Sequence, residues 1–144
     1  MPGYSLKRTI MGQFPFGADL LESLTQFVRK EKIHSGRING IGATTHAVLA
    51  YYDQIQKKYL SMEFPGGMEI LNLQGNVSIR DGNPFVHVHI LLGDPQGKVF
   101  GGHLMPGTKL WACEVVIDEF TGEELARGED PRTRLFLWKT GFLS

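Results

Sequence analysis

The stretch from His87 to His103 constrains the fold most, because a tight turn divides it into two arms of β-strand composition. The turn is Asp94-Pro95-Gln96-Gly97, with proline at the second position of a type I turn. Gly97 then suits the left-handed position of a three-residue hairpin loop with a bulge. Such a loop closes between Asp94 and Lys98 and pairs His89 with His103. The sequence therefore predicts an antiparallel hairpin with one defined register.

This register would gather three histidines, His87, His89 and His103, on one face of the hairpin. Side chains alternate along a strand, so His87 and His89 share a face. Directly opposed side chains lie about 5 Å apart and diagonal ones roughly 7–8 Å apart, close enough to share one ion. We therefore expect a metal site, with zinc as the metal, formed by three neutral imidazoles. A polar cluster without metal is the alternative, and a loop one residue longer or shorter would turn His103 to the other face.

The composition is that of one globular domain. The chain has 144 residues, 42% of them hydrophobic, and no segment approaches the ~20 apolar residues of a membrane span. Cys113 is the single cysteine, so an intrachain disulfide is impossible, and the first residues lack the apolar run of a signal peptide. We expect a cytoplasmic protein without membrane contact. Fifteen basic and fifteen acidic residues give a formal charge of zero, which disfavours strong nonspecific binding to nucleic acid.

One helix is predicted near the N-terminus, over about residues 20–33. Asp19 can cap it, and Glu22 stands three residues further on, as in a capping box. Apolar residues at positions 20, 24, 27 and 28 then follow helical spacing. We expect the helix to end at Gly36.

The rest of the chain has the pattern of strands separated by turns. A first strand is expected over residues 4–14, and further ones over 45–52, 58–64, 69–80, 109–120 and 135–138, besides the histidine hairpin. Pro65-Gly66-Gly67 is interpreted as a turn, Gly75 as a bulge and residues 123–126 as one helical turn. The predicted fold class is α+β: a single domain over residues 4–140, with a twisted, mostly antiparallel sheet and one main helix packed on it.

Other residues are weaker candidates for a functional site. Glu69 and Glu114 stand inside apolar strands, where a carboxylate beside a metal could act as a general base, although a solvent-facing position is more usual. His34 and His46 are expected to be surface or hydrogen-bonded residues, and Cys113 a buried, unreactive thiol. Trp111 and Trp138 are expected in the core or at a subunit interface.

Three segments of the chain resemble the PPC (plant and prokaryote conserved) domain, which also occurs in plant AT-hook nuclear-localized proteins. They are residues 40–53, which begin Gly-Ile-Gly-Ala, residues 67–76, and the histidine hairpin from His87 to Leu104. The match extends over about residues 4–140 and is closest to the stand-alone prokaryotic members. The resemblance implies a twisted antiparallel sheet, a homotrimer, and a metal, most often zinc, on His87, His89 and His103.

The resemblance also implies an association with DNA. In the plant proteins, the contact with the minor groove comes from a separate AT-hook, and its Arg-Gly-Arg-Pro core does not occur in this sequence. We therefore favour a non-enzymatic binding domain that holds a metal and a small-molecule ligand, DNA or a transcription-related protein partner. The alternatives are a zinc-dependent hydrolase or lyase that uses an open metal position, and direct binding to DNA.

Overall fold

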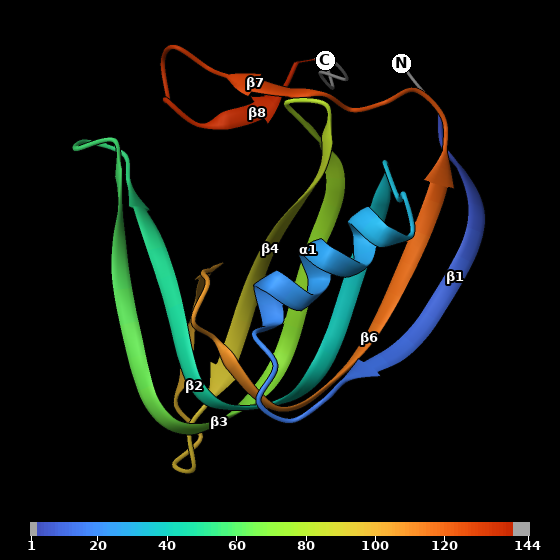
Figure 1. Ribbon diagram of the computed structural model, residues 1–144. Coiled ribbons are helices and arrows are strands. Elements are labelled where there is room, and N and C mark those ends of the chain that lie inside the picture. Colours follow the sequence, from blue (N-terminus) through green and yellow to red (C-terminus); the bar gives the residue numbers. More distant parts are fainter. Residues whose placement is uncertain (1–2, 140–144) are drawn as a thin grey trace.

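The computed structural model describes residues 3–139, which form a strongly curved sheet with one helix on its concave side (Figure 1). The sheet has six strands in the order β1-β6-β2-β3-β4-β5, and its strand pairings are antiparallel. Its elements are β1 (Ser5–Phe14), α1 (Leu20–Lys30), β2 (Gly36–Asp53), β3 (Lys58–Arg80), β4 (Asn83–Gly93), β5 (Val99–Leu104) and β6 (Lys109–Thr121). The expected α+β class is confirmed, and no helix among the described residues has the length and apolar character needed to cross a bilayer.

The long strand β2 organises the sheet. It pairs with β6 and β3 on its two sides, and near its C-terminal end it also pairs with β5, where Leu49 is opposite Leu104 and Ala50 is opposite His103. This last pairing brings the edge strand β5 back to the middle of the sheet. The remainder of the β2–β3 hairpin extends beyond it as an arm (Figure 1).

Helix α1 covers the core through its apolar stripe. Leu20, Leu24 and Val28 are fully buried, in one cluster with the inward-facing residues of β4. The predicted cap is present, since the Asp19 carboxylate accepts a hydrogen bond from the backbone N–H of Glu22 at 3.1 Å.

The helix ends at Lys30 and not at residue 33 as expected. The reason is a Schellman motif, in which the N–H of Ile33 donates to the Val28 carbonyl and the N–H of Lys32 donates to the Arg29 carbonyl. Lys32 takes the left-handed conformation with φ of 53°, a position that glycine usually fills. Ile33 and Val28 are both fully buried, so apolar packing stabilises this end of the helix without a glycine.

Three further expectations about local structure are wrong. Residues 65–67 do not turn the chain: they lie within β3, where the pairing with β2 shifts register between Thr44 and His46. Gly75 is not a bulge, because its pairing is regular on both sides. Residues 123–126 form no helical turn; Ala126 makes a β-bridge with Ile79, and the chain continues into β7 (Arg127–Glu129), which pairs with β8 (Phe136–Trp138).

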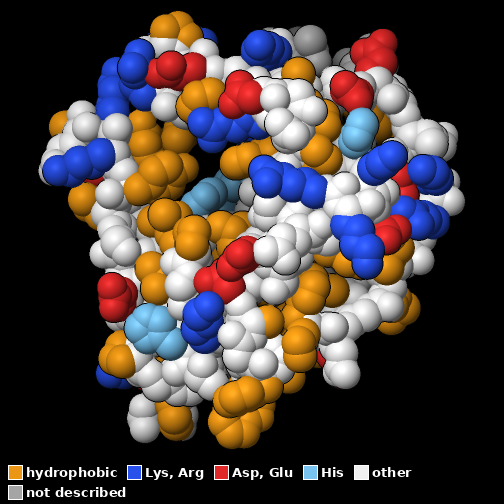
Figure 2. All heavy atoms as spheres, viewed as in Figure 1, with side chains coloured by type: hydrophobic (Ala, Val, Ile, Leu, Met, Phe, Trp, Pro, Cys, Tyr) orange, Lys and Arg blue, Asp and Glu red, His pale blue; other side chains and the backbone are white. Residues whose placement is uncertain are grey.

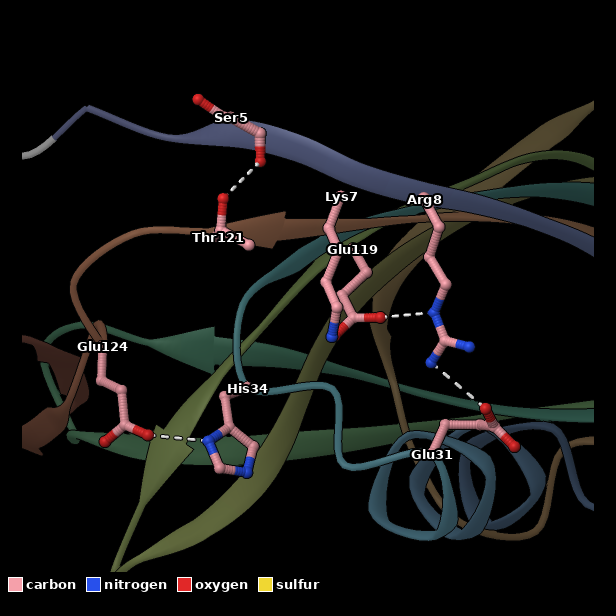
Figure 3. A network of polar contacts seen from close by, with 8 residues as sticks. All are labelled: Ser5, Lys7, Arg8, Glu31, His34, Glu119, Thr121 and Glu124. Carbon is pink, nitrogen blue, oxygen red and sulfur yellow. Dashed lines mark hydrogen bonds and ion pairs between the residues drawn. The ribbon is translucent and has the colours of Figure 1, made fainter.

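A polar network fastens the N-terminal strand to the rest of the molecule (Figure 3). Glu119 of β6, almost fully buried, accepts hydrogen bonds from Lys7 and Arg8 of β1. Arg8 also reaches Glu31 at the end of α1. Strand β1 is therefore tied both to its neighbour in the sheet and to the helix.

Candidate metal centre

The histidine hairpin has the register that the turn predicts. His89 is opposite His103, and the backbone N–H of Asp94 donates to the carbonyl of Lys98 at 2.9 Å. Gly97 has a φ of 79°, the left-handed conformation that this loop requires. The residues of β4 that alternate with the histidines, at positions 86, 88, 90 and 92, are buried on the side of α1. The histidines therefore lie on the face of the sheet that is opposite the helix.

His87, His89 and His103 form a compact triangle. The ring centroids are 5.0 Å apart for His87 and His103, 5.1 Å for His87 and His89, and 5.4 Å for His89 and His103. Each ring offers one nitrogen such that all three nitrogens lie within 4.8 Å of one another. The diagonal pair is thus as close as the directly opposed pair.

The spacing of the nitrogens suits a tetrahedral metal. The Nε2 atoms of His87 and His89 are 3.2 Å apart. Two imidazoles on a tetrahedral zinc ion, each with a Zn–N bond of about 2.0–2.1 Å, place their nitrogens roughly 3.3 Å apart. Three neutral nitrogen donors are also a set that zinc accepts, with a fourth position left for another ligand.

The surroundings keep two of the imidazoles neutral at physiological pH. Burial, followed by the neighbouring His103, Arg127 and His89, lowers the pKa of His87 to about 4. Burial, followed by His89 and Arg127, lowers the pKa of His103 to about 4 as well. Neutral imidazole is the form that binds a metal, so protons do not compete for these two rings near pH 7.

Gly75 allows β3 to lie close beside β4, the strand that carries His87 and His89. A Cβ atom at position 75 would lie only 2.3 Å from the carbonyl oxygen of His87 and 2.9 Å from the Cα of Val88. Both contacts are with backbone, which cannot swing aside. The lack of a side chain at Gly75 therefore fixes the position of β4 at His87.

Arg127 is a component of the site that the sequence reading missed. It lies in β7, is only 7% exposed, and its Nη2 is 3.5 Å from Nδ1 of His87. Short hydrogen bonds hold it to Ser78, Asn76 and the carbonyl of Phe136. Nothing in the local pattern around residue 127 marks it, because its partners are distant in sequence.

The site lies in a hollow. The view in Figure 2 shows histidine side chains at the bottom of a depression that hydrophobic side chains and Lys or Arg side chains border. Tyr59, from the arm formed by β2 and β3, packs beside the cluster, with its ring centroid 5.1 Å from that of His103, and Tyr52 packs on Tyr59 at 5.0 Å. Aromatic rings thus form one wall beside the histidines.

The weaker candidates from the sequence lie elsewhere. Glu69 and Glu114 are exposed, and neither belongs to the histidine cluster. His34 contacts Glu124 at 2.7 Å, a pair shown in Figure 3, and His46 lies 3.9 Å from Glu63. Within one chain, none of these residues lies close enough to the three histidines to share a metal with them.

The remaining three candidates have different outcomes. Cys113 is buried as expected, and burial followed by Glu114 raises the pKa of its thiol to about 11. Trp111 is exposed and packs edge-on against Phe16, so it is not part of the core of this chain. Trp138 is partly exposed in β8.

Comparison with known proteins agrees with the fold. A protein of Archaeoglobus fulgidus described as metal-containing shares 38% sequence identity, with a TM-score of 0.91 over 97% of this chain and 99% of its own. A plant- and prokaryote-conserved protein of Pyrococcus horikoshii shares 37% identity, with a TM-score of 0.92 over 98% of this chain and 97% of its own. A candidate DNA-binding protein of Bacteroides thetaiotaomicron shares 29% identity, with a TM-score of 0.86 over 94% and 96% of the two chains.

Curated relatives are much longer proteins. The bifunctional protein GlmU of Synechococcus sp. (strain JA-3-3Ab) is 33% identical over 119 residues, which are 81% of this chain and 18% of that protein. The chain therefore spans less than a fifth of this relative. The profile of the Plants and Prokaryotes Conserved (PCC) domain, the family that the sequence resembles, matches residues 1–121. The chain belongs to the PCC domain family.

Proposed function

We propose that this chain is a metal-binding PCC domain, a single cytoplasmic domain over residues 4–140 that assembles as a homotrimer and holds zinc on His87, His89 and His103. Position 140 lies outside the described residues. The observation that supports metal binding is the geometry of the three rings: two Nε2 atoms lie 3.2 Å apart, and all three ligand nitrogens lie within 4.8 Å of one another. The similar protein of A. fulgidus described as metal-containing supports the same function.

Metal analysis of the purified protein tests this proposal. We expect close to one zinc ion per chain after loading with zinc and removal of the excess, and a large loss of zinc in His89→Ala. His46→Ala is the matched control, because it removes a histidine outside the cluster. Equal zinc content in wild type and His89→Ala would contradict the proposed ligands.

Assembly with further copies of the chain, which we propose to be a homotrimer, is supported by exposed apolar side chains of the sheet. Met11, Ile41 and Trp111 come from β1, β2 and β6 and are each more than half exposed. Met11 and Ile41 also border a shallow cavity of about 600 Å³ on this surface. Exposed apolar residues that lie together, as Met11 and Ile41 do, are typical of an interface between subunits. Light scattering at the outlet of a sizing column should give three times the chain mass of 16.1 kDa, and a monomer would contradict the assembly.

The setting that we propose for this domain is DNA-related regulation through a protein partner. Candidate DNA-binding proteins are among the similar structures, but the zero formal charge of this chain disfavours direct electrostatic contact. We expect no tight gel shift with the isolated protein at physiological salt. The alternative of a zinc-dependent hydrolase or lyase requires a general base, and the two carboxylates considered from the sequence lie outside the cluster.

A further inference from the structure

A buried cationic side chain, Arg127, lies beside the histidines without an acidic partner among the described residues. Arg127 is almost fully buried beside His87, and within the part of the chain that the structure describes no Asp or Glu oxygen lies within 4.0 Å of it. The histidine cluster also contains no carboxylate. Burying an unpaired guanidinium is costly, and neutral hydrogen-bond acceptors compensate only part of that cost.

The hydrogen bonds of Arg127 leave part of its guanidinium free. A guanidinium has five N–H donors. The Nε donor is used by Ser78, one Nη1 donor by the carbonyl of Phe136 and one Nη2 donor by Asn76, at 2.7–2.9 Å. One further donor on each of Nη1 and Nη2 remains, and the latter faces His87 only at the long distance of 3.5 Å. These neutral partners, with the rings of Phe85 and Trp138 whose centroids lie 5.4 and 5.7 Å from the guanidinium carbon, offset part of the cost of burial, but no described carboxylate pairs with the charge.

The position of Arg127 is built from two elements of the fold. Its own strand β7 belongs to the small β7–β8 sheet, whereas Asn76 and Ser78 belong to β3. Asn76 is directly opposite His87 in the pairing of β3 with β4, so its side chain lies on the same face as the histidine. The arginine is therefore held against the face that carries the metal ligands.

An apolar wall accompanies this charge. Tyr59 is partly exposed, although its ring packs beside His103. A ligand in the hollow would meet the guanidinium of Arg127 next to the histidines and an aromatic ring at the side. Figure 2 shows hydrophobic side chains around the histidines, with basic and acidic side chains at the rim.

We propose that the hollow is a binding site for a small organic carboxylate, whose carboxylate group pairs with Arg127 and whose apolar part packs on Tyr59. This inference rests on the proposed metal site in one respect: a divalent ion on the three histidines adds positive charge to a cluster that contains no carboxylate, and it favours the same kind of ligand. Arginine suits this role, because its planar fork matches the geometry of a carboxylate.

The test uses wild-type protein with benzoate as the probe and benzamide as its neutral counterpart. Binding is followed by ¹H–¹⁵N NMR titration of the zinc-loaded and the zinc-stripped protein. We expect saturable binding of benzoate with shift changes around Arg127 and Tyr59, and roughly tenfold or more weaker binding of benzamide, as for loss of a charge-assisted hydrogen bond. Equal binding of the two compounds, or no saturable binding of benzoate in either form, overturns the proposal. Tighter binding of inorganic phosphate than of benzoate overturns the assignment to carboxylates.

Two variants test whether Arg127 is the residue that pairs with the carboxylate. Arg127→Met should weaken benzoate binding roughly tenfold or more, whereas Arg132→Met, which removes an exposed arginine from the segment between β7 and β8, should leave it unchanged. If Arg127→Met does not fold, the comparison of benzoate with benzamide on wild type still decides the question. Zinc content is measured in parallel. Binding of benzoate to a protein that takes up no zinc would refute the metal site alone, and a zinc-loaded protein that does not distinguish benzoate from benzamide would refute the carboxylate site alone.

Discussion

Acidification should destabilise the metal-free protein through its histidine cluster. His87 and His103 have pKa values of about 4 in the folded protein, against 6.5 for the ordinary side chain. Between these values the unfolded chain binds protons that the folded protein does not, so the free energy of unfolding falls as the pH falls. The contribution of these two histidines to the free energy of unfolding is fully present above pH 6.5 and is lost as the pH falls toward 4.

The magnitude follows from the size of the shifts. One pKa unit corresponds to about 1.4 kcal/mol, so each of the two histidines contributes up to about 3 kcal/mol across the window. Together they account for up to about 6 kcal/mol, a large part of the 5–15 kcal/mol that is typical of a folded domain. Asp118 and Glu119, whose pKa values are lowered from 3.8 and 4.5, act in the same direction but at lower pH.

Urea unfolding of the zinc-stripped protein at a series of pH values between 7 and 4 measures this effect. The wild type is compared with a variant that carries His87→Gln and His103→Gln, and with His34→Gln as a control outside the cluster. We expect a steep loss of stability in wild type and in the control, and a much flatter dependence in the double variant. Parallel curves for wild type and the double variant would refute the assignment of the effect to these two residues.

Three further changes test the packing that positions the site. Gly75→Ala should lower the free energy of unfolding by about 1–3 kcal/mol, as expected for overpacking, because the new Cβ would press on the carbonyl oxygen of His87. Gly12→Ala, with open space at its Cβ, is the control, and equal urea midpoints for both would contradict the explanation. Asp19→Ala should cost about 1–2 kcal/mol, measured by thermal unfolding, because it removes the helix cap and the hydrogen bond that the carboxylate accepts from the Gly107 N–H; an unchanged melting temperature would count against both roles. Leu24→Ala should cost about 2–5 kcal/mol in urea because its side chain is fully buried, and a loss below 1 kcal/mol would show that the helix does not pack as described.

The histidine hairpin was predictable because its determinants are local. The turn at residues 94–97 specifies the loop length, the loop length specifies the register, and the register places His103 opposite His89. The start of the helix was predictable for the same reason, since Asp19 caps a helix whose apolar stripe follows directly.

Features that depend on tertiary packing were not predictable in this way. The helix ends at Lys30 because the burial of Ile33 and Val28 stabilises a left-handed lysine, a position where sequence rules expect glycine. Gly75 has the pattern of a bulge, and only the distance to the carbonyl oxygen of His87 shows its role as a close approach. Arg127 joins the site through contacts with residues some 40–50 positions earlier in the chain, and no local periodicity encodes such contacts.

The pairing of β5 with β2 has a consequence for the order in which the protein folds. His87, His89 and the turn are close in sequence, so the hairpin can form early and at a low entropic cost of loop closure. Ala50 and His103, in contrast, come together only when a long intervening segment that contains the whole of β3 and β4 is already ordered. We therefore expect two kinetic phases in refolding: the histidine hairpin forms in the faster phase, and β5 pairs with β2 in the slower one. The ring of His103 therefore reaches its final environment beside Tyr59 in the slower phase.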